Sequence, residues 1–185
     1  MGKAFNASEF RSSFKGHNPA STSYFMVRLA LPKAFNSATK GGAYIENFSN
    51  RAVACDLPTV EIDTTVRAYN GPMRQIPTGH IHPTSIVEFI EGEDGMIREF
   101  FDKWLNYIYD VKNGYRVPFY DDIISEKMSI DVYARNGELI SIYDFHDVFP
   151  RSISPTQMHW TPSGNPMTVP VEFSYHKWTR SNVGG

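Results

Sequence analysis

Two histidines at alternate positions are the sharpest chemical signal in the sequence. His80 and His82 lie in the stretch GHIHPTSIVE, which ends at Glu88. Alternate residues of a β-strand point to the same side of the strand, and imidazole nitrogens together with a carboxylate oxygen are common ligands of zinc. The pattern therefore raises the hypothesis of a metal site in which His80, His82 and Glu88 are the ligands.

Metal-binding double-stranded β-helices of the cupin type use such a pair, so a cupin-like metalloenzyme is the alternative from a different functional class. The stretch departs from the cupin pattern, because Pro83 follows directly, Glu88 lies too far along, and no second cupin motif is recognisable downstream. The two histidines also lie in a segment rich in strand breakers. We therefore expect no metal ion and no other cofactor.

The other reactive side chains fit structural roles better than catalytic ones. Cys55 is the single cysteine, which excludes an internal disulfide, and we expect it to be a small buried apolar residue. The chain contains no GxSxG, GxGxxG or GxxxxGK(S/T) motif. We expect no enzymatic activity and interpret the remaining candidates as surface, turn or strand-edge residues: Asp121, Asp122, Asp144, Asp147, His146, His159 and His176.

The composition points to a folded protein that associates with other protein. With 185 residues, of which 41% are apolar, the chain is long enough to bury one core without disulfides or metals. Thirteen Phe, ten Tyr and three Trp exceed what a small core needs, and aromatic residues are favoured in subunit contacts. A net charge of −2 argues against a protein that grips nucleic acid through its phosphates.

No segment predicts a targeting signal or a membrane anchor. Asn6, Ser8 and Glu9 interrupt the first apolar run, which is unlike a signal peptide. The longest apolar stretches are far shorter than the ~20 residues that a membrane helix needs. We therefore expect a soluble protein made in the cytoplasm.

Alternation of apolar and polar residues predicts a mainly β fold. The segment 69–80 carries four breakers and is expected to be a loop. Strands are predicted at Tyr24–Leu31, Ala52–Leu57, Val60–Ala68, Ser85–Ile90, on both sides of a turn within 128–145, and at Val169–Tyr175.

One amphipathic helix is predicted at about 95–111. Its apolar residues recur at the spacing of one helix face and comprise Ile97, Phe100, Phe101, Trp104, Leu105 and Ile108. Asp94 is the expected N-cap, and Gly114 lies where a left-handed stop is expected. The helix is predicted to lie on a sheet.

Asn136–Gly137 predicts a tight hairpin of type I′ between two alternating runs. This turn would place Arg135 opposite Glu138, Ile130 opposite Tyr143, and Met128 opposite Phe145.

The organisation is that of one domain with an appended arm. Residues 1–22 form an N-terminal arm with three spaced phenylalanines, and residues 23–185 form a single β domain with an insertion loop at 33–50. Strands and helix together predict two packed antiparallel sheets, a sandwich or barrel, closed by the amphipathic helix.

The C-terminal third resembles the tail tube proteins of contractile-tailed bacteriophages. The segments that carry the resemblance are SIDVYARNG, LISIYDFHDVFPRSI, MHW and VPVEFSYHKW, and upstream YFMVRLAL, AVACDLPTVEI and FFDKW follow in the order of the family. The resemblance covers most of residues 24–178. It implies two packed antiparallel sheets plus a helix, as in the type VI secretion tube protein.

The resemblance also implies a function without catalysis. Hexameric rings whose inner strands join into a continuous β-barrel would stack inside a contractile sheath and conduct DNA into the host. The implied location is the virion tail, after assembly in the host cytoplasm. The implied partners are the sheath, baseplate or initiator and terminator proteins, with a tape measure protein in the lumen. Alternatives of the same class are an initiator ring of the baseplate and the tube of a phage-derived injection system.

A corner is predicted after the long strand that begins at Leu139. Proline cannot donate to a strand ladder, so Pro150 and Pro155 are expected to stop this strand at Phe149. The chain would then cross to the other sheet, with Phe149 and Trp160 as hydrophobic anchors on either side of the corner.

Overall fold

The computed structural model describes residues 22–35, 48–67, 71–110, 114–116, 119–156, 164 and 166–182. The predicted N-terminal arm, apart from its last residue, lies outside the described residues. So do residues 36–47 of the predicted insertion, His159, and the predicted anchor Trp160. Side chains of residues 115–116 are likewise not described. Among the described residues, no helix is both long and apolar enough to cross a membrane.

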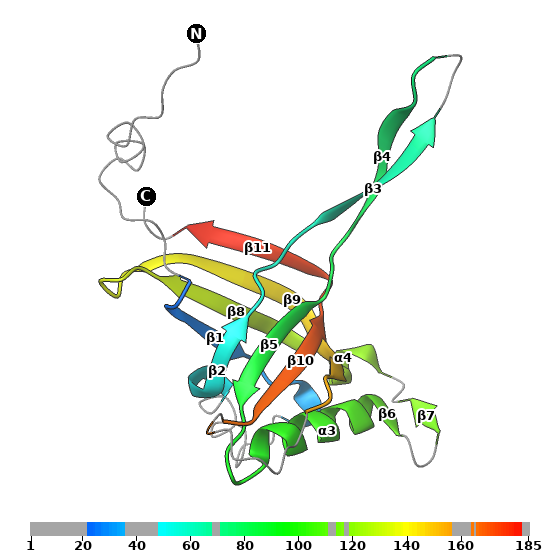
Figure 1. Cartoon of the computed structure of the whole chain (residues 1–185). Helices are drawn as coiled ribbons and strands as arrows, with labels where there is room; N and C mark the ends of the chain where they lie inside the picture. Colours follow the sequence, from blue (N-terminus) through cyan, green and yellow to red (C-terminus); the bar gives the residue numbers. More distant parts are fainter. Residues whose placement is uncertain are drawn as a thin grey trace.

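Two antiparallel sheets share one long strand, β9 (Leu139–Ile153), which confirms the predicted mainly β fold (Figure 1). Sheet A consists of β1 (Phe25–Leu29), β8 (Ser125–Tyr133), the first part of β9 and β11 (Lys177–Asn182), in that order. Sheet B consists of the last part of β9, β10 (Thr168–Ser174), β5 (Ser85–Ile90) and β2 (Ala52–Cys55).

The shorter elements lie around α3 (Met96–Ile108) or project from the body. They are η1 (Lys33–Phe35), β3 (Glu61–Arg67), β4 (Arg74–Ile81), β6 (Tyr109–Asp110), β7 (Tyr115–Arg116) and α4 (Tyr120–Ile123).

The crossing between the sheets occurs inside β9, so the prediction that Pro150 stops the strand is wrong. Asp147 has a φ of 55°, the one positive value outside glycine among the described residues, and it turns the strand from sheet A to sheet B. Pro150 lies opposite Phe173 next to a register shift, where the ladder is already interrupted and a missing N–H costs little. Phe149 is half-buried against the core, as predicted for an anchor.

The β8–β9 hairpin has the predicted register but a different turn. Met128 pairs with Phe145 and Ile130 with Tyr143, as expected. Only Gly137 has a positive φ, whereas type I′ needs one at both central residues, and Ala134 rather than Arg135 bonds with Glu138. The turn is therefore a three-residue loop with a bulge at glycine, which absorbs one residue near the tip and leaves the distant pairs unchanged.

The segment 69–80 was predicted to be a loop, but residues 74–80 belong to β4, which ends at Ile81 and pairs with β3 along its whole length. The two strands make a ribbon that projects far from the body, here called the arm (Figure 1). In a two-stranded ribbon half of the N–H groups have no ladder partner, so Pro77 and Gly79 are tolerated close to the register shift at Asp63.

The core lies between the two sheets and α3. The predicted helix stripe is confirmed: Ile97, Phe100, Phe101 and Trp104 are buried, and the Trp104 indole donates to the Ile123 carbonyl over 2.8 Å. The strands contribute alternate residues to the same core, as predicted for β10. They include Val27, Val87, Phe89, Met128, Ile130, Phe145, Val169, Val171 and Phe173.

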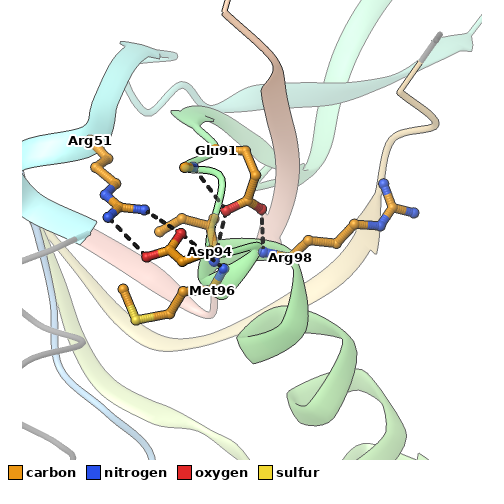
Figure 2. Close-up of polar contacts among 7 residues, drawn as sticks. Arg51, Glu91, Asp94, Met96 and Arg98 are labelled. Carbon is orange, nitrogen blue, oxygen red and sulfur yellow. Dashed lines mark hydrogen bonds and ion pairs between the residues drawn. The ribbon is translucent and has the colours of Figure 1, made fainter.

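Two carboxylates outside the helix satisfy its N-terminus (Figure 2). Glu91 accepts from the backbone N–H groups of Ile97 (3.1 Å) and Arg98 (2.7 Å). The N-cap position is Gly95, with φ 62°, so the prediction of Asp94 as N-cap is wrong. Asp94 instead accepts from the Met96 N–H and pairs with Arg51, which ties the helix to the start of β2. The Arg51 hydrogen bond and then that of Met96 lower the pKa of the Asp94 carboxyl.

Replacing Glu91 with alanine is expected to destabilise the fold by about 1.5–3 kcal/mol, because the charge-assisted bonds to the first turn of α3 are lost. Urea unfolding of the unassembled chain measures the change. Glu93→Ala, at an exposed position in the same loop, is the matched control and should change stability by less than about 0.5 kcal/mol. Equal effects of the two substitutions would contradict this account of the helix start.

Candidate assembly surfaces

The histidine pair lies at the base of the arm. His80 is in β4 and His82 follows it, with ring centroids 5.3 Å apart. Within the described residues, no group of three or more His, Cys, Asp or Glu side chains is placed to hold a metal ion, so His80, His82 and Glu88 do not converge. The His82 ring instead packs on Tyr175, whose hydroxyl donates to the Thr59 carbonyl over 3.4 Å. These contacts fasten the arm to sheet B.

The other candidate residues lie in separate parts of the structure. Cys55 is half-buried, and burial together with the nearby Asp56 charge raises the pKa of its thiol to about 11, which keeps it protonated at neutral pH. Asp121 and Asp122 lie in α4. His146 contacts the Thr179 hydroxyl across sheet A. His176 lies between β10 and β11.

Sheet A has two open edges. Within the described part of the chain no strand pairs with the outer side of β1 or of β11. In an antiparallel pair the residues alternate between bonding to one neighbour and to the other. Tyr24 and Ala30 bond to β8, so the N–H and C=O groups of Phe25, Val27 and Leu29 point to the open edge.

The same alternation, followed through the registers of β8 and β9, shows which residues of β11 bond to β9 and which point to the open edge. Thr179 and Ser181 bond to β9, so Trp178, Arg180 and Asn182 point their backbone groups outward. On both edges the side chains of the outward-bonding residues are on the core side of the sheet. The two edges are therefore mutually compatible: joined side by side in antiparallel orientation, they would continue one sheet with its faces in register.

The outer face of sheet A, opposite the core, carries ion pairs. Arg28 binds Asp131 over 2.8 Å and Lys127 binds Asp144 over 2.9 Å. Ser129 also donates to Asp144, over 2.7 Å. Burial opposes ionisation of Asp144, but the hydrogen bonds from Ser129 and Lys127 outweigh it and lower the pKa of its carboxyl.

The charges of this face nearly cancel. Along β1, β8, β11 and β9 up to His146, the register places three cations and two carboxylates on the outer face: Arg28, Lys127, Lys177, Asp131 and Asp144. The two carboxylates form ion pairs with two of these cations, Arg28 and Lys127. Sequence reasoning did not identify this network, although the alternation of charged and apolar residues in β8 places Lys127, Ser129 and Asp131 on one face.

Sheet B carries a second carboxylate that its neighbours hold in place. Glu172 accepts hydrogen bonds from Thr84 (2.6 Å) and Ser152 (2.7 Å), with Arg151 at 3.7 Å. The bond from Thr84, followed by that from Ser152, lowers the pKa of the Glu172 carboxyl. The network fixes β10 between its two neighbours and offers no free acid or base.

The arm is exposed along its whole length. One face carries apolar and uncharged side chains, among them Ile62, Val66 and Pro77. The other face carries all four charged residues of β3 and β4: Glu61, Asp63, Arg67 and Arg74. A two-stranded ribbon by itself is at best marginally stable in water. The arm therefore has the character of a contact element.

A family model described as phage tail tube protein matches residues 20–181 of the chain. No curated protein matches it by sequence.

Several solved structures have a similar fold. A chain of the anti-feeding prophage baseplate is 10% identical, with a TM-score of 0.65, over 90% of this chain and 98% of that one. A chain of the PVC extracellular contractile injection system, in its sheath–tube complex in the extended state, is 13% identical, with a TM-score of 0.62, over 97% and 100%. The Hcp1 protein of E. coli EAEC 042 is 12% identical, with a TM-score of 0.50, over 87% and 92%. At these identities the likeness concerns the fold.

Proposed function

The chain belongs to the phage tail tube protein family, and on that premise we propose that it is the repeated subunit of the tube, forming hexameric rings that stack inside a contractile sheath and conduct DNA into the host. The family is one of structural proteins of the virion tail, which agrees with the structural roles found for the candidate catalytic residues. The observation that carries the proposal is the pair of compatible open edges of sheet A.

The two open edges of sheet A support the proposed ring closure. The strands of sheet A alternate in direction from β1 to β11, so β11 of one subunit and β1 of the next would pair antiparallel. Side by side, Trp178 and Arg180 would lie next to core-facing residues of β1. Heterologous contacts of this kind generate a ring when the rotation between subunits closes, and closure removes exposed strand edges.

The outer face of sheet A would line the channel. DNA that contacts free cations is held in proportion to the number of phosphates neutralised. The Arg28–Asp131 and Lys127–Asp144 pairs neutralise two cations within each subunit. A lumen of this kind lets a polyanion pass without strong retention.

Similar structures support the proposed partners. Two are described as a sheath–tube complex and a baseplate, and another as a sheath/tube terminator of the PVC system with a TM-score of 0.59. Sheath, baseplate or initiator and terminator proteins are therefore the proposed neighbours, and a tape measure protein is the proposed occupant of the lumen before ejection. The likeness to injection-system chains favours an initiator ring or an injection-system tube as the second candidate.

A proline substitution tests ring closure at the edge of β11. Arg180→Pro removes an N–H that points outward, and we expect the chain to keep its fold and lose ring formation, seen by negative-stain electron microscopy. Thr179→Pro is the matched comparison, because that N–H belongs to the ladder with β9; it should lower the melting temperature of the single chain. Normal rings from Arg180→Pro would contradict the proposed junction.

Freed cations test the channel lining. The double variant Asp131→Asn and Asp144→Asn releases Arg28 and Lys127, and we expect assembled rings to bind a short DNA duplex about tenfold more tightly at low salt, with a steeper salt dependence. Fluorescence anisotropy measures the affinity.

The matched control releases two cations on α3, through Glu99→Gln and Asp102→Asn, whose partners are Lys103 and Arg98. A smaller gain is expected there, because copies of sheet A converge on the axis whereas copies of α3 spread around the outside. Equal gains in the two variants would contradict the assignment of sheet A to the lumen.

A further inference from the structure

The acidic and basic residues of the arm lie at opposite ends of the β3–β4 ribbon. Glu61 and Asp63 lie near the base, and Arg67 and Arg74 lie directly opposite each other next to the tip. Met73, which precedes Arg74, has 78% of its surface exposed. We call Arg67, Met73 and Arg74 the arm tip. It combines two cations with one large apolar side chain.

This arrangement is unfavourable in an isolated subunit. Like charges directly opposite each other on paired strands destabilise the pairing, and the two strands pair with no other strand among the described residues. The exposed thioether adds apolar surface in contact with water. A partner that supplies negative charge and apolar surface would relieve both costs.

A surface with this chemistry lies at α4 of the same chain. Phe119 is 66% and Tyr120 is 52% exposed, and the carboxylates of Asp121 and Asp122 follow them directly. Asp147 also lies close, because burial and then the charges of Asp147 and Asp121 raise the pKa of the Tyr120 hydroxyl. We call Phe119, Tyr120, Asp121 and Asp122 the α4 surface. It combines two exposed rings with several negative charges.

The arm tip and the α4 surface belong to separate parts of the molecule. The arm projects away from the body, whereas α4 lies on the side of the body next to α3 (Figure 1). Two different, complementary surfaces on one chain produce head-to-tail association, which repeats without closing when the rotation between successive copies does not complete a ring. This is the symmetry that a stack of rings needs.

We propose that the arm tip of each subunit binds the α4 surface of a second copy of this chain in the adjacent ring. Arg67 and Arg74 would form charge-assisted hydrogen bonds with the carboxylates and cation–π contacts with the aromatic side chains of Phe119 and Tyr120. Met73 would cover Phe119. The inference rests on the proposed function, because it requires rings that stack, and it names the residues that join one ring to the next.

A charge swap tests the contact in the full-length protein. One variant carries Arg67→Glu and Arg74→Glu, a second carries Asp121→Arg and Asp122→Arg, and a third carries all four substitutions. We expect wild-type protein to form multi-ring tubes. The first two variants should form single rings, with the mass in tubes reduced at least tenfold in sedimentation velocity. The third should regain tubes, because opposite charges meet again at every contact.

The matched control is Arg98→Glu with Lys103→Glu, which makes the same charge change on the outer face of α3 and should leave tube length unchanged. Thermal melting shows that each variant is folded. Because the first variant changes only the exposed arm, it remains informative if the α4 variant fails to fold.

Tubes of normal length from the first variant, or no recovery in a folded four-fold variant, would overturn the proposed contact while leaving ring formation intact. Absence of rings in the wild-type protein would overturn the proposed function and this inference with it.

Discussion

The proposed assembly depends on backbone N–H and C=O groups at the two edges of sheet A, which no strand of the described residues pairs. Sheet A ends in β1 on one side and β11 on the other, and both strands direct alternate N–H and C=O groups away from the sheet. Long unpaired edges are a hazard for a protein that acts alone, since they template association with any other strand. In the proposed ring they would become the contacts that join the subunits. The same closure would give the ion pairs of the outer face a role, because the ring would turn that face into a channel wall.

The remaining elements make this edge geometry rigid. The aromatic side chains of α3 fill the space between the sheets. Glu91 binds the first turn of the helix and so holds it at the end of β5. β9 belongs to both sheets and turns at Asp147, so one continuous strand joins sheet A to sheet B. The arm is fastened at its base through His82 and Tyr175, and it projects away from the body (Figure 1). A stiff body with one projecting ribbon suits a subunit that must form the same contacts many times.

Most of the fold could be predicted from periodicity, and the exceptions have physical causes. The helix stripe follows from the helical spacing of its apolar residues, and the strands β1, β5, β8 and β10 follow from alternation, because burial on one face dictates each pattern. β4 was predicted to be a loop because Pro77 and Gly79 break strands that are paired on both sides, whereas β4 is paired on one. The hairpin turn differed because Asn136–Gly137 also fits a turn with a bulge at glycine. The crossing at Asp147 rests on a positive φ at a residue other than glycine, which no sequence pattern marks.

The candidate site was less predictable than the fold. The histidine spacing raised the hypothesis of a metal site, although the neighbouring residues argued against it, and spacing along one strand does not show where Glu88 lies. The function followed instead from the resemblance carried by β8, β9 and β10. The open edges and the arm are regions that no other part of the described chain covers. The alternation of apolar and polar residues is the same in a strand with two neighbours and in a strand with one, so the sequence does not reveal such edges. The sequence of one copy is rich in aromatic residues, but it does not show which strand edges would pair between copies.

Cryo-electron microscopy of the assembled full-length protein tests the central claim most directly. The account predicts rings in which β11 of each subunit runs antiparallel beside β1 of its neighbour, with the backbone groups of Trp178 and Arg180 bonded to that strand and Asp131 and Asp144 facing the channel. Rings whose β1 and β11 edges face solvent, or a protein that stays monomeric at high concentration, would contradict it.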